Sequence, residues 1–332
     1  MTNPKYSIII PVYNRPYEVD ELLISLTIQK YQNFDVVIVE DGSQIDCKEI
    51  VAKYSSSLNI KYFFKPNSGP GTTRNYGAER ATGEYFIFFD SDCIIPEHYF
   101  QAVDAELEKK PTDAFGGPDK AHPSFSSVQK AINYSMTSFF TTGGIRGGKE
   151  RFDKFYPRSF NMGISKHAFN KTGGFSHLRF GEDIDFSIRI LKAGFTTRLF
   201  PEAFVYHKRR TNFSKFYKQV YNSGIARINL HLLHPGSLKL VHLLPSAFVI
   251  GMILMIAGTI ITPFTLLMPA IYSMLVFIHS MAINKNPRVA FLSIPAAWVQ
   301  LFGYGLGFLS AVWKRLILNR KEFRAFEKNF YS

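Results

Sequence analysis

The feature that most constrains the fold is a series of four short apolar runs within the first ninety residues. The runs, separated by stretches with helical spacing or turn signals, are Tyr6–Val12, Asp35–Glu40, Asn59–Phe64 and Tyr85–Phe89. Near-continuous apolar strands that alternate with helices are typical of a parallel sheet covered on both faces. We therefore predict an α/β fold with a mostly parallel, Rossmann-like sheet flanked by helices.

The segments between and after these runs give further structural expectations. A helix is expected over Tyr17–Gln29, and Thr72 and Thr73 are expected to cap a helix that ends at Ala81. The later segments expected to be extended are Asp113–Pro118, Arg158–Ser165 and Phe195–His207. The glycine-rich stretch 141–148 is expected to be either a mobile loop over the site or a plain linker.

Carboxylates follow two of the predicted strands. Asp90 and Asp92 come directly after the fourth run, and Asp41 follows the second. Ligands of such sheets bind beyond the carboxyl ends of the strands. Two carboxylates one residue apart can share Mg²⁺ or Mn²⁺ with a diphosphate. Asp41 can accept a hydrogen bond from a nucleobase or a ribose, or simply form a turn with Gly42.

Other polar residues have a functional and a structural interpretation. Arg74 can meet a diphosphate or be a surface arginine. Glu182 and Asp183 open a predicted helix, where acidic groups either complement the helix dipole or serve as a general base. His207 can be a third metal ligand or one more polar residue beside the basic stretch that follows it.

The second half of the chain is apolar with basic flanks. From Phe213 an amphipathic helix with a basic face is expected, either in a membrane interface or packed against the catalytic domain. No charged residue occurs from Leu243 to Ile283, about twice the roughly 20 residues that a span needs, and Pro263 suggests a hairpin. Val289–Trp313 is a third apolar segment that either spans or is re-entrant or interfacial, because three spans would contradict the positive-inside tendency.

Charge and cysteine content narrow the class of protein. The net charge of +13 is concentrated beside the apolar segments, which indicates a lipid surface and not nucleic acid. Two cysteines make no disulfide framework, and the N-terminus lacks a signal-peptide pattern. Residues 1 to 235 are therefore expected in the cytoplasm. A transporter is disfavoured because no acid or base marks a path through the apolar segments.

Five stretches taken in order resemble the family 2 glycosyltransferases with the GT-A fold. The stretches that carry the resemblance, over about residues 5–230, are Ser7–Arg15, Val37–Ser43, Gly69–Asp92, Asn161–Phe175 and Gly181–Ile190. The resemblance implies a nucleotide-sugar donor, for which we predict UDP over GDP, and a divalent metal, Mn²⁺ or Mg²⁺. It also implies inversion at the anomeric carbon by direct displacement.

The resemblance implies roles for individual residues. The residues implied to bind the donor are Pro11, Tyr13, Asp41, Arg74 and Asp90. Those implied at the metal are Asp90, Asp92 and His207. Asp183 matches the catalytic base, and Glu182 would help to position the acceptor. The family's processive synthases carry a QxxRW motif that is absent after Gln219, which disfavours processive synthesis.

We therefore predict a cytoplasmic catalytic domain over 1–235 that includes the helix 213–230, a membrane domain over 236–313 and a basic tail over 314–332. The predicted reaction transfers a sugar to a hydroxyl of a lipid-linked or growing glycan. It serves cell-surface polysaccharide or glycolipid synthesis as a multi-pass protein of the inner membrane. The alternatives are sugar transfer directly to polyprenyl phosphate, and a catalytically inactive membrane scaffold of the same fold.

Overall fold

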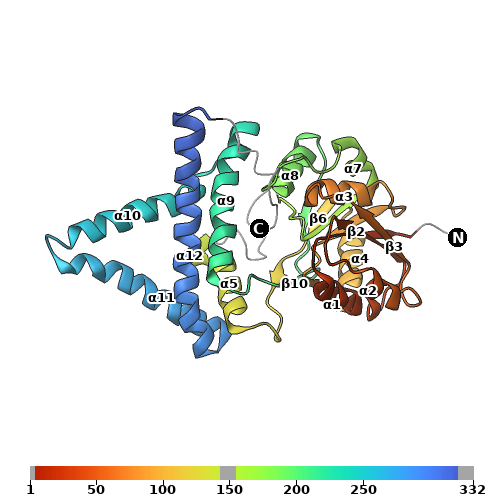
Figure 1. Cartoon of the computed structure of the whole chain (residues 1–332), viewed down its shortest axis with the longest axis horizontal. Coiled ribbons are helices and arrows are strands. Elements are labelled where there is room, and N and C mark those ends of the chain that lie inside the picture. Colours follow the sequence, from red (N-terminus) through yellow and green to blue (C-terminus); the bar gives the residue numbers. More distant parts are fainter. Residues whose placement is uncertain (1–3, 143–154, 321–332) are drawn as a thin grey trace. The chain divides into compact units, whose positions relative to one another are not determined.

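The computed structural model describes residues 4–142 and 155–320, which divide into two compact units (Figure 1). The first unit comprises the described residues 4–120 and 155–207. The second unit comprises residues 121–142 and 208–320. The unit boundary thus lies before the amphipathic helix, whereas we predicted it near residue 235. Most of the glycine-rich stretch 141–148 and of the basic tail lies outside the described residues.

The first unit contains a seven-stranded sheet of order β3-β2-β1-β4-β8-β6-β9. The predicted runs form its four adjacent parallel strands, β1 (Tyr6–Val12), β2 (Phe34–Asp41), β3 (Ile60–Lys65) and β4 (Tyr85–Phe89). Strand β8 (Asn161–Ser165) is antiparallel to its neighbours, and β6 (Ala114–Gly116) and β9 (Thr197–Leu199) are parallel to each other. The prediction of a mostly parallel sheet is confirmed.

A smaller sheet joins two distant parts of the same unit. Strand β10 (Val205–His207) pairs antiparallel with β5 (Cys93–Ile94) and parallel with β7 (Asp119–Lys120). In this register His207 lies opposite Cys93. The pairing therefore carries the end of the first unit back to the carboxyl end of β4.

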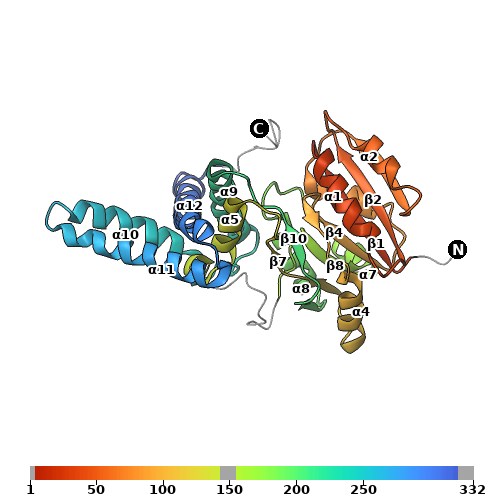
Figure 2. The same cartoon turned by 90° about the horizontal axis from the view of Figure 1, so that it is seen from below.

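Both faces of the large sheet are buried under helices (Figure 2). Alternate residues of each strand point to opposite faces, so that Ile8 and Ile10 join one core and Ile9 the other. The helices that contribute to the first core are α1 (Pro16–Thr27), α2 (Lys48–Lys53) and α4 (Tyr99–Lys109). Those of the second are α3 (Pro70–Ala78), α7 (Lys166–Thr172) and α8 (Glu182–Lys192).

Helix α3 begins earlier than expected, at Pro70, so the prediction that Thr72 and Thr73 cap it is wrong. Gly69 has a φ of 91° and turns the chain into the helix. Proline is favoured in the first helical turn because its missing N–H would be unpaired there in any case. The buried Thr73 hydroxyl instead donates to the Gly69 carbonyl at 2.8 Å.

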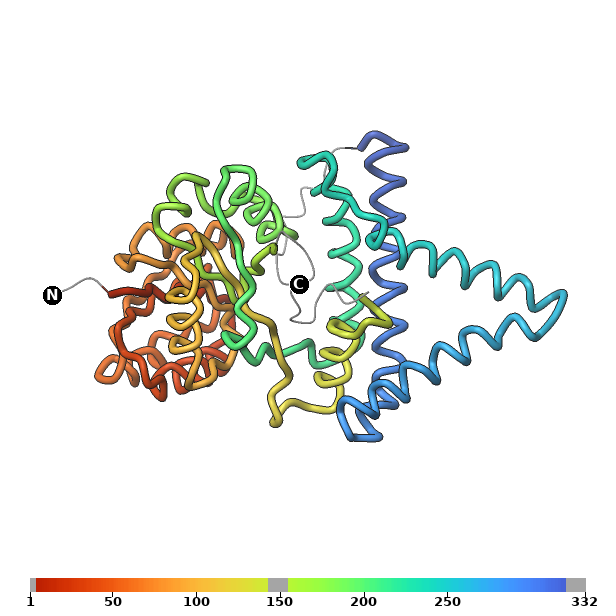
Figure 3. Tube along the Cα trace, turned by 180° about the vertical axis from the view of Figure 1, so that it is seen from behind, coloured from red at the N-terminus to blue at the C-terminus, as the bar shows by residue number. Residues whose placement is uncertain are grey.

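The second unit is entirely helical over its described residues. Its helices are α5 (Ser127–Thr137), α6 (Phe139–Thr142), α9 (Phe213–Leu233), α10 (Leu244–Gly258), α11 (Leu267–Asn284) and α12 (Pro287–Ala311). The predicted hairpin is present, with α10 and α11 joined by a short turn that contains Pro263 (Figure 3). Two helices, Pro263–Asn284 and Pro287–Ile317, are long and apolar enough to cross a membrane.

We expect Phe100→Ala to destabilise the first unit by about 3–5 kcal/mol, because a large buried aromatic side chain is replaced by a cavity. Phe100 is fully buried and its ring stacks on Phe34 at a centroid distance of 4.8 Å. The urea midpoint of unfolding measures the loss. Phe64→Ala is the matched control, since Phe64 is more than half exposed. Equal midpoints for the two variants would contradict the assignment of Phe100 to the core.

Candidate active site

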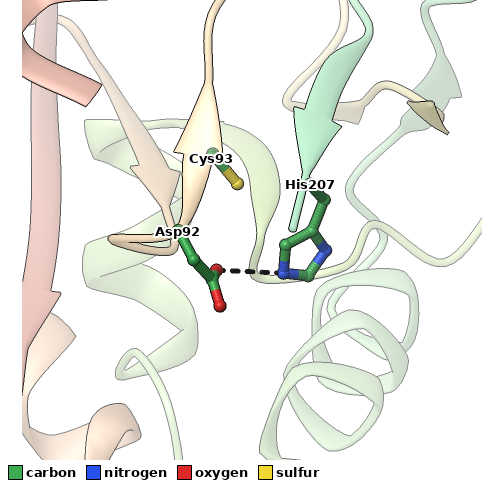
Figure 4. A group of neighbouring side chains, drawn as sticks. All are labelled: Asp92, Cys93 and His207. Carbon is green, nitrogen blue, oxygen red and sulfur yellow. Dashed lines mark ion pairs between the residues drawn. The ribbon is translucent and has the colours of Figure 1, made fainter. Parts of the chain in front are cut away.

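Asp90, Asp92 and His207 meet at the carboxyl end of β4. Pairing of β5 with β10 brings together two segments that are far apart in the sequence. The Asp92 Oδ1 atom lies 3.1 Å from His207 Nε2, and Asp90 Oδ2 lies 3.9 Å from the same nitrogen (Figure 4). Two carboxylates and one imidazole therefore converge at this point.

These side chains have the chemistry of a divalent-cation site. Asp92 Oδ1 is buried and faces the His207 imidazole at 3.1 Å. Oxygen ligands suit Mg²⁺ and Mn²⁺, and imidazole suits transition metals. Cys93, which we did not predict, also lies within 4.8 Å of this group. Burial raises the pKa of the Cys93 thiol well above its usual value.

Arg15 is a site residue that the sequence interpretation missed. Its guanidinium donates to Asp92 Oδ2 from the loop between β1 and α1. Burial raises the pKa of Asp92, but the charges of Arg15 and His207 outweigh burial and hold it well below the usual value. Asp92 is therefore ionised, as a metal ligand must be. Arg15 and Asp92 are 77 positions apart in the sequence, and no local pattern predicts a contact over that separation.

Arg74 connects this group to the start of α8. Its side chain is only 3% exposed. It donates to Asp90 Oδ1 at 2.6 Å and to Glu182 Oε1 at 3.2 Å. One guanidinium thus joins the carboxyl end of β4 to the first turn of α8.

The two acidic residues at the start of α8 differ in ionisation. Burial, followed by the charge of Asp183, raises the pKa of Glu182 to about 7. Burial by itself would also raise the pKa of Asp183. The charge of the neighbouring Arg158 has the opposite effect and outweighs burial, so that the pKa of Asp183 is lowered. Asp183 accepts from Arg158 Nε at 2.6 Å and from the Ile184 N–H at 2.8 Å. Asp183 is consequently the group that is ionised at neutral pH.

Arg158 is the second site residue that we did not single out. It lies in the segment before β8, where its backbone forms a bridge with Asn161. The Ser187 hydroxyl of α8 donates to the Pro157 carbonyl at 2.7 Å, which ties this segment to the same helix as Asp183. The only sequence signal for Arg158 was its place at the start of a predicted extended stretch.

Asp41 lies apart from these contacts. Its carboxylate accepts from the N–H groups of Ser68 and Gly69, at 2.8 and 2.9 Å, and from the Lys65 ammonium. It therefore stabilises the loop before α3, and no contact within the described residues joins it to Asp90 or Asp92. These contacts join Asp41 to the loop before α3, whereas the alternative raised from the sequence was a turn with Gly42. The role of Asp41 at the nucleotide stays a prediction.

Pro11 and Tyr13 lie at the carboxyl end of β1, next to the end of β2. Pro11 is opposite Val39 in the parallel register. The Asn14 side chain accepts from the N–H groups of Gln44 and Ile45 and so links the loops that follow these two strands. The predicted donor-binding residues Pro11, Tyr13 and Asp41 therefore share one edge of the sheet.

Known proteins resemble the chain in sequence. An uncharacterized glycosyltransferase of Rickettsia conorii is 44% identical over 108 residues, which are 32% of this chain and 17% of that protein. An uncharacterized glycosyltransferase of Haemophilus influenzae is 31% identical over 221 residues, 63% of this chain and 70% of that protein. The chain spans only 14–23% of the length of three Rickettsia relatives.

A solved structure and a protein-family model also match the chain. A Pyrobaculum calidifontis mannosyltransferase, solved with GDP-Man and Mn²⁺, has a TM-score of 0.63 at 15% identity, covering 95% of this chain and 89% of its own. This likeness shows a shared fold. The model described as Glycosyl transferase family 2 matches residues 7–173, half of the chain, which include Arg15, Arg74 and the Asp90–Asp92 pair. The chain therefore belongs to glycosyl transferase family 2.

Proposed function

We propose that this glycosyltransferase inverts the anomeric centre as it moves a sugar from a nucleoside-diphosphate donor to an acceptor hydroxyl. The observation that carries the proposal is the buried Arg74, which contacts both Asp90 and Glu182. Through it the residues suited to a metal and those suited to acceptor activation belong to one connected group. Such an arrangement matches displacement at a carbon held between a leaving diphosphate and an attacking hydroxyl.

The donor end of the proposal rests on the carboxyl ends of β1, β2 and β4. We assign Asp90, Asp92 and His207 to a divalent cation, Mn²⁺ or Mg²⁺, and Pro11, Tyr13, Asp41 and Arg74 to the nucleotide. When bound, such a cation supplies Lewis-acid neutralisation of the charge on a departing diphosphate. The Mn²⁺ and GDP-Man named for the Pyrobaculum structure support a metal and a nucleotide sugar. We retain UDP as the predicted nucleotide.

The acceptor end rests on the first turn of α8. The ionised Asp183 takes the proton of the acceptor hydroxyl while the acceptor oxygen bonds to the anomeric carbon and the bond to the diphosphate breaks. Arg158 keeps Asp183 oriented and ionised. We assign the orientation of the acceptor to Glu182, which Arg74 contacts. A positioned base typically contributes about 10²–10⁴-fold to the rate.

The acceptor in this proposal is a lipid-linked or growing glycan for the cell surface. The support is the apolar second unit with basic residues at its flanks, which favours reaction beside a bilayer. A cytoplasmic face of the inner membrane is the expected location, because that compartment supplies nucleotide sugars. No nucleic-acid partner is proposed.

Replacing the proposed base should abolish transfer without unfolding the protein. We expect Asp183→Asn to lower release of nucleoside diphosphate from a nucleotide sugar by at least about 100-fold. Asp185→Asn is the control, because Asp185 lies in the same helical turn but pairs with Arg189. Full activity of Asp183→Asn on a glycan hydroxyl would contradict the role. Activity kept only toward polyprenyl phosphate would favour the alternative acceptor, since that phosphate is already anionic.

Loss of a metal ligand should weaken cation binding directly. We expect Asp92→Ala and His207→Ala each to raise the dissociation constant for Mn²⁺ by about tenfold or more, because each removes one of few ligands. Titration calorimetry with MnCl₂ and UDP measures this. Asp113→Ala is the control, because Asp113 precedes β6 and so lies at the edge of the sheet opposite to the carboxyl end of β4. Chelation of the wild-type protein with EDTA should stop diphosphate release, and unchanged Mn²⁺ affinity in both variants would refute the site.

Arg158→Gln tests the source of the Asp183 ionisation. Without the guanidinium, burial remains and the pKa of Asp183 rises. A base works only when deprotonated, so the acidic limb of the kcat/KM profile should move to higher pH by about 1 to 3 pH units. Arg158→Lys, which keeps the charge, should move the limb less. An unmoved limb in the glutamine variant would show that Asp183 is not the titrating base.

A further inference from the structure

The hairpin of α10 and α11 exposes apolar side chains over most of its length. It extends away from α12 within the second unit (Figures 1 and 3). Only 11% of the α11 segment Pro263–Asn284 is buried inside the protein. The large exposed side chains lie on several faces of both helices and at the turn, and include Ile250, Ile253, Leu254, Ile256, Ile260, Ile261, Phe264, Met268 and Met274. A partner that covers a single stripe would leave most of them in water.

The turn of this hairpin satisfies its own backbone. The N–H groups of residues 259 to 262 donate to the carbonyls of Ile256, Ala257 and Gly258. The Thr262 hydroxyl accepts from the Phe264 N–H at 3.4 Å. In hydrocarbon, polar backbone groups must be paired internally, because no water is present. Each of these N–H groups has an acceptor within the hairpin, as hydrocarbon requires.

Charged residues lie only outside the hairpin. No Asp, Glu, Lys or Arg occurs between Lys239 and Lys285. Lys239 precedes α10, and Lys285 and Arg288 follow α11, all of them exposed. Basic residues next to an apolar segment favour an anionic lipid surface. Both ends of the hairpin are therefore suited to the same headgroup layer.

Helix α12 is also long and apolar enough to cross a membrane, but its environment differs from that of the hairpin. It packs backbone to backbone against α9. A Cβ atom added at Gly224 of α9 would lie 2.2 Å from the Tyr304 carbonyl oxygen, and one at Gly307 would lie 2.1 Å from the Tyr221 carbonyl oxygen. Such distances leave no room for any side chain at either glycine. The two helices therefore form one rigid pair.

Helix α9 cannot enter hydrocarbon with its partner. It carries Lys215, Lys218 and Arg227, and the first two are exposed. Twelve residues from the first to the last of these correspond to about 18 Å along the helix. A crossing by the pair would place at least one of these charges deep in the bilayer, which is strongly unfavourable.

We propose that the α10–α11 hairpin is the membrane-inserted element and that α12 does not cross the bilayer. The occupant of the exposed hairpin surface is phospholipid, and α9 and α12 stay together on the side from which the hairpin enters. Both ends of α12 then lie on one side of the membrane. The proposal does not depend on the catalytic assignment.

Flotation of the purified full-length chain on phosphatidylcholine–phosphatidylglycerol vesicles tests insertion. The double variant Ile253→Lys/Ile256→Lys should lose vesicle binding by at least tenfold. The matched control is Ile28→Lys/Ile45→Lys, in which two isoleucines of similar exposure, 57% and 65% against 59% and 57%, change in the first unit. Unchanged flotation of the hairpin variant would overturn the proposal. So would a lipid-free dimer of the wild-type chain that the two introduced lysines dissociate, which would show that a second copy of the chain covers the hairpin.

Cysteine labelling in sealed membrane vesicles tests the position of α12. Arg288→Cys places a thiol in the first turn of α12, and Leu318→Cys places one after the helical segment that follows α12. The native Cys47 and Cys93 are buried. An impermeant maleimide should label both introduced thiols in vesicles of one orientation and neither in the other. Labelling of the two positions from opposite sides would show that α12 spans. The single-cysteine readout is independent of enzymatic activity.

Discussion

A single buried guanidinium, that of Arg74, holds the candidate site together. An ionised group removed from water is very unfavourable unless charged partners surround it. Arg74 has such partners in Asp90 and Glu182, which belong to different elements of the first unit. Its position therefore fixes the start of α8 relative to the end of β4. Without it, Asp90 and Glu182 would lose the positive charge that lies between them.

A second arginine divides the work of two adjacent acids. Glu182 and Asp183 are neighbours in sequence and are both buried. Arg158 binds Asp183 and lowers its pKa, while burial and the Asp183 charge raise the pKa of Glu182 to about 7. Different partners thus give two similar side chains different ionisation. This separation suits one carboxylate to accept a proton and the other to orient a hydroxyl.

The two long apolar segments of the second unit differ in their surroundings. For Pro263–Asn284 11% is buried in the protein, and for Pro287–Ile317 44% is buried. Glycines at the contact of α9 and α12 allow the close approach that accounts for the difference. Close to half of the α12 segment is therefore buried inside the protein, whereas most of α11 is uncovered.

The sequence by itself determined the four parallel strands, the helical hairpin and the kinds of side chain at the strand ends. These features are local, because strand and helix periodicity and turn residues are read within about ten positions. Asp90, Asp92, Glu182 and Asp183 were predicted as site residues for the same reason, since each follows a strand or opens a helix.

Only the tertiary structure decided which of these residues meet. The contacts of Arg15 with Asp92, of Arg158 with Asp183 and of Asp41 with the loop before α3 had no local signal. The pairing of α12 with α9 had none either. The side-chain contacts depend on strand order and register, and the helix pairing depends on the close approach of two backbones that are distant in sequence. Local periodicity does not encode those quantities, because they are set by how all the elements pack at once.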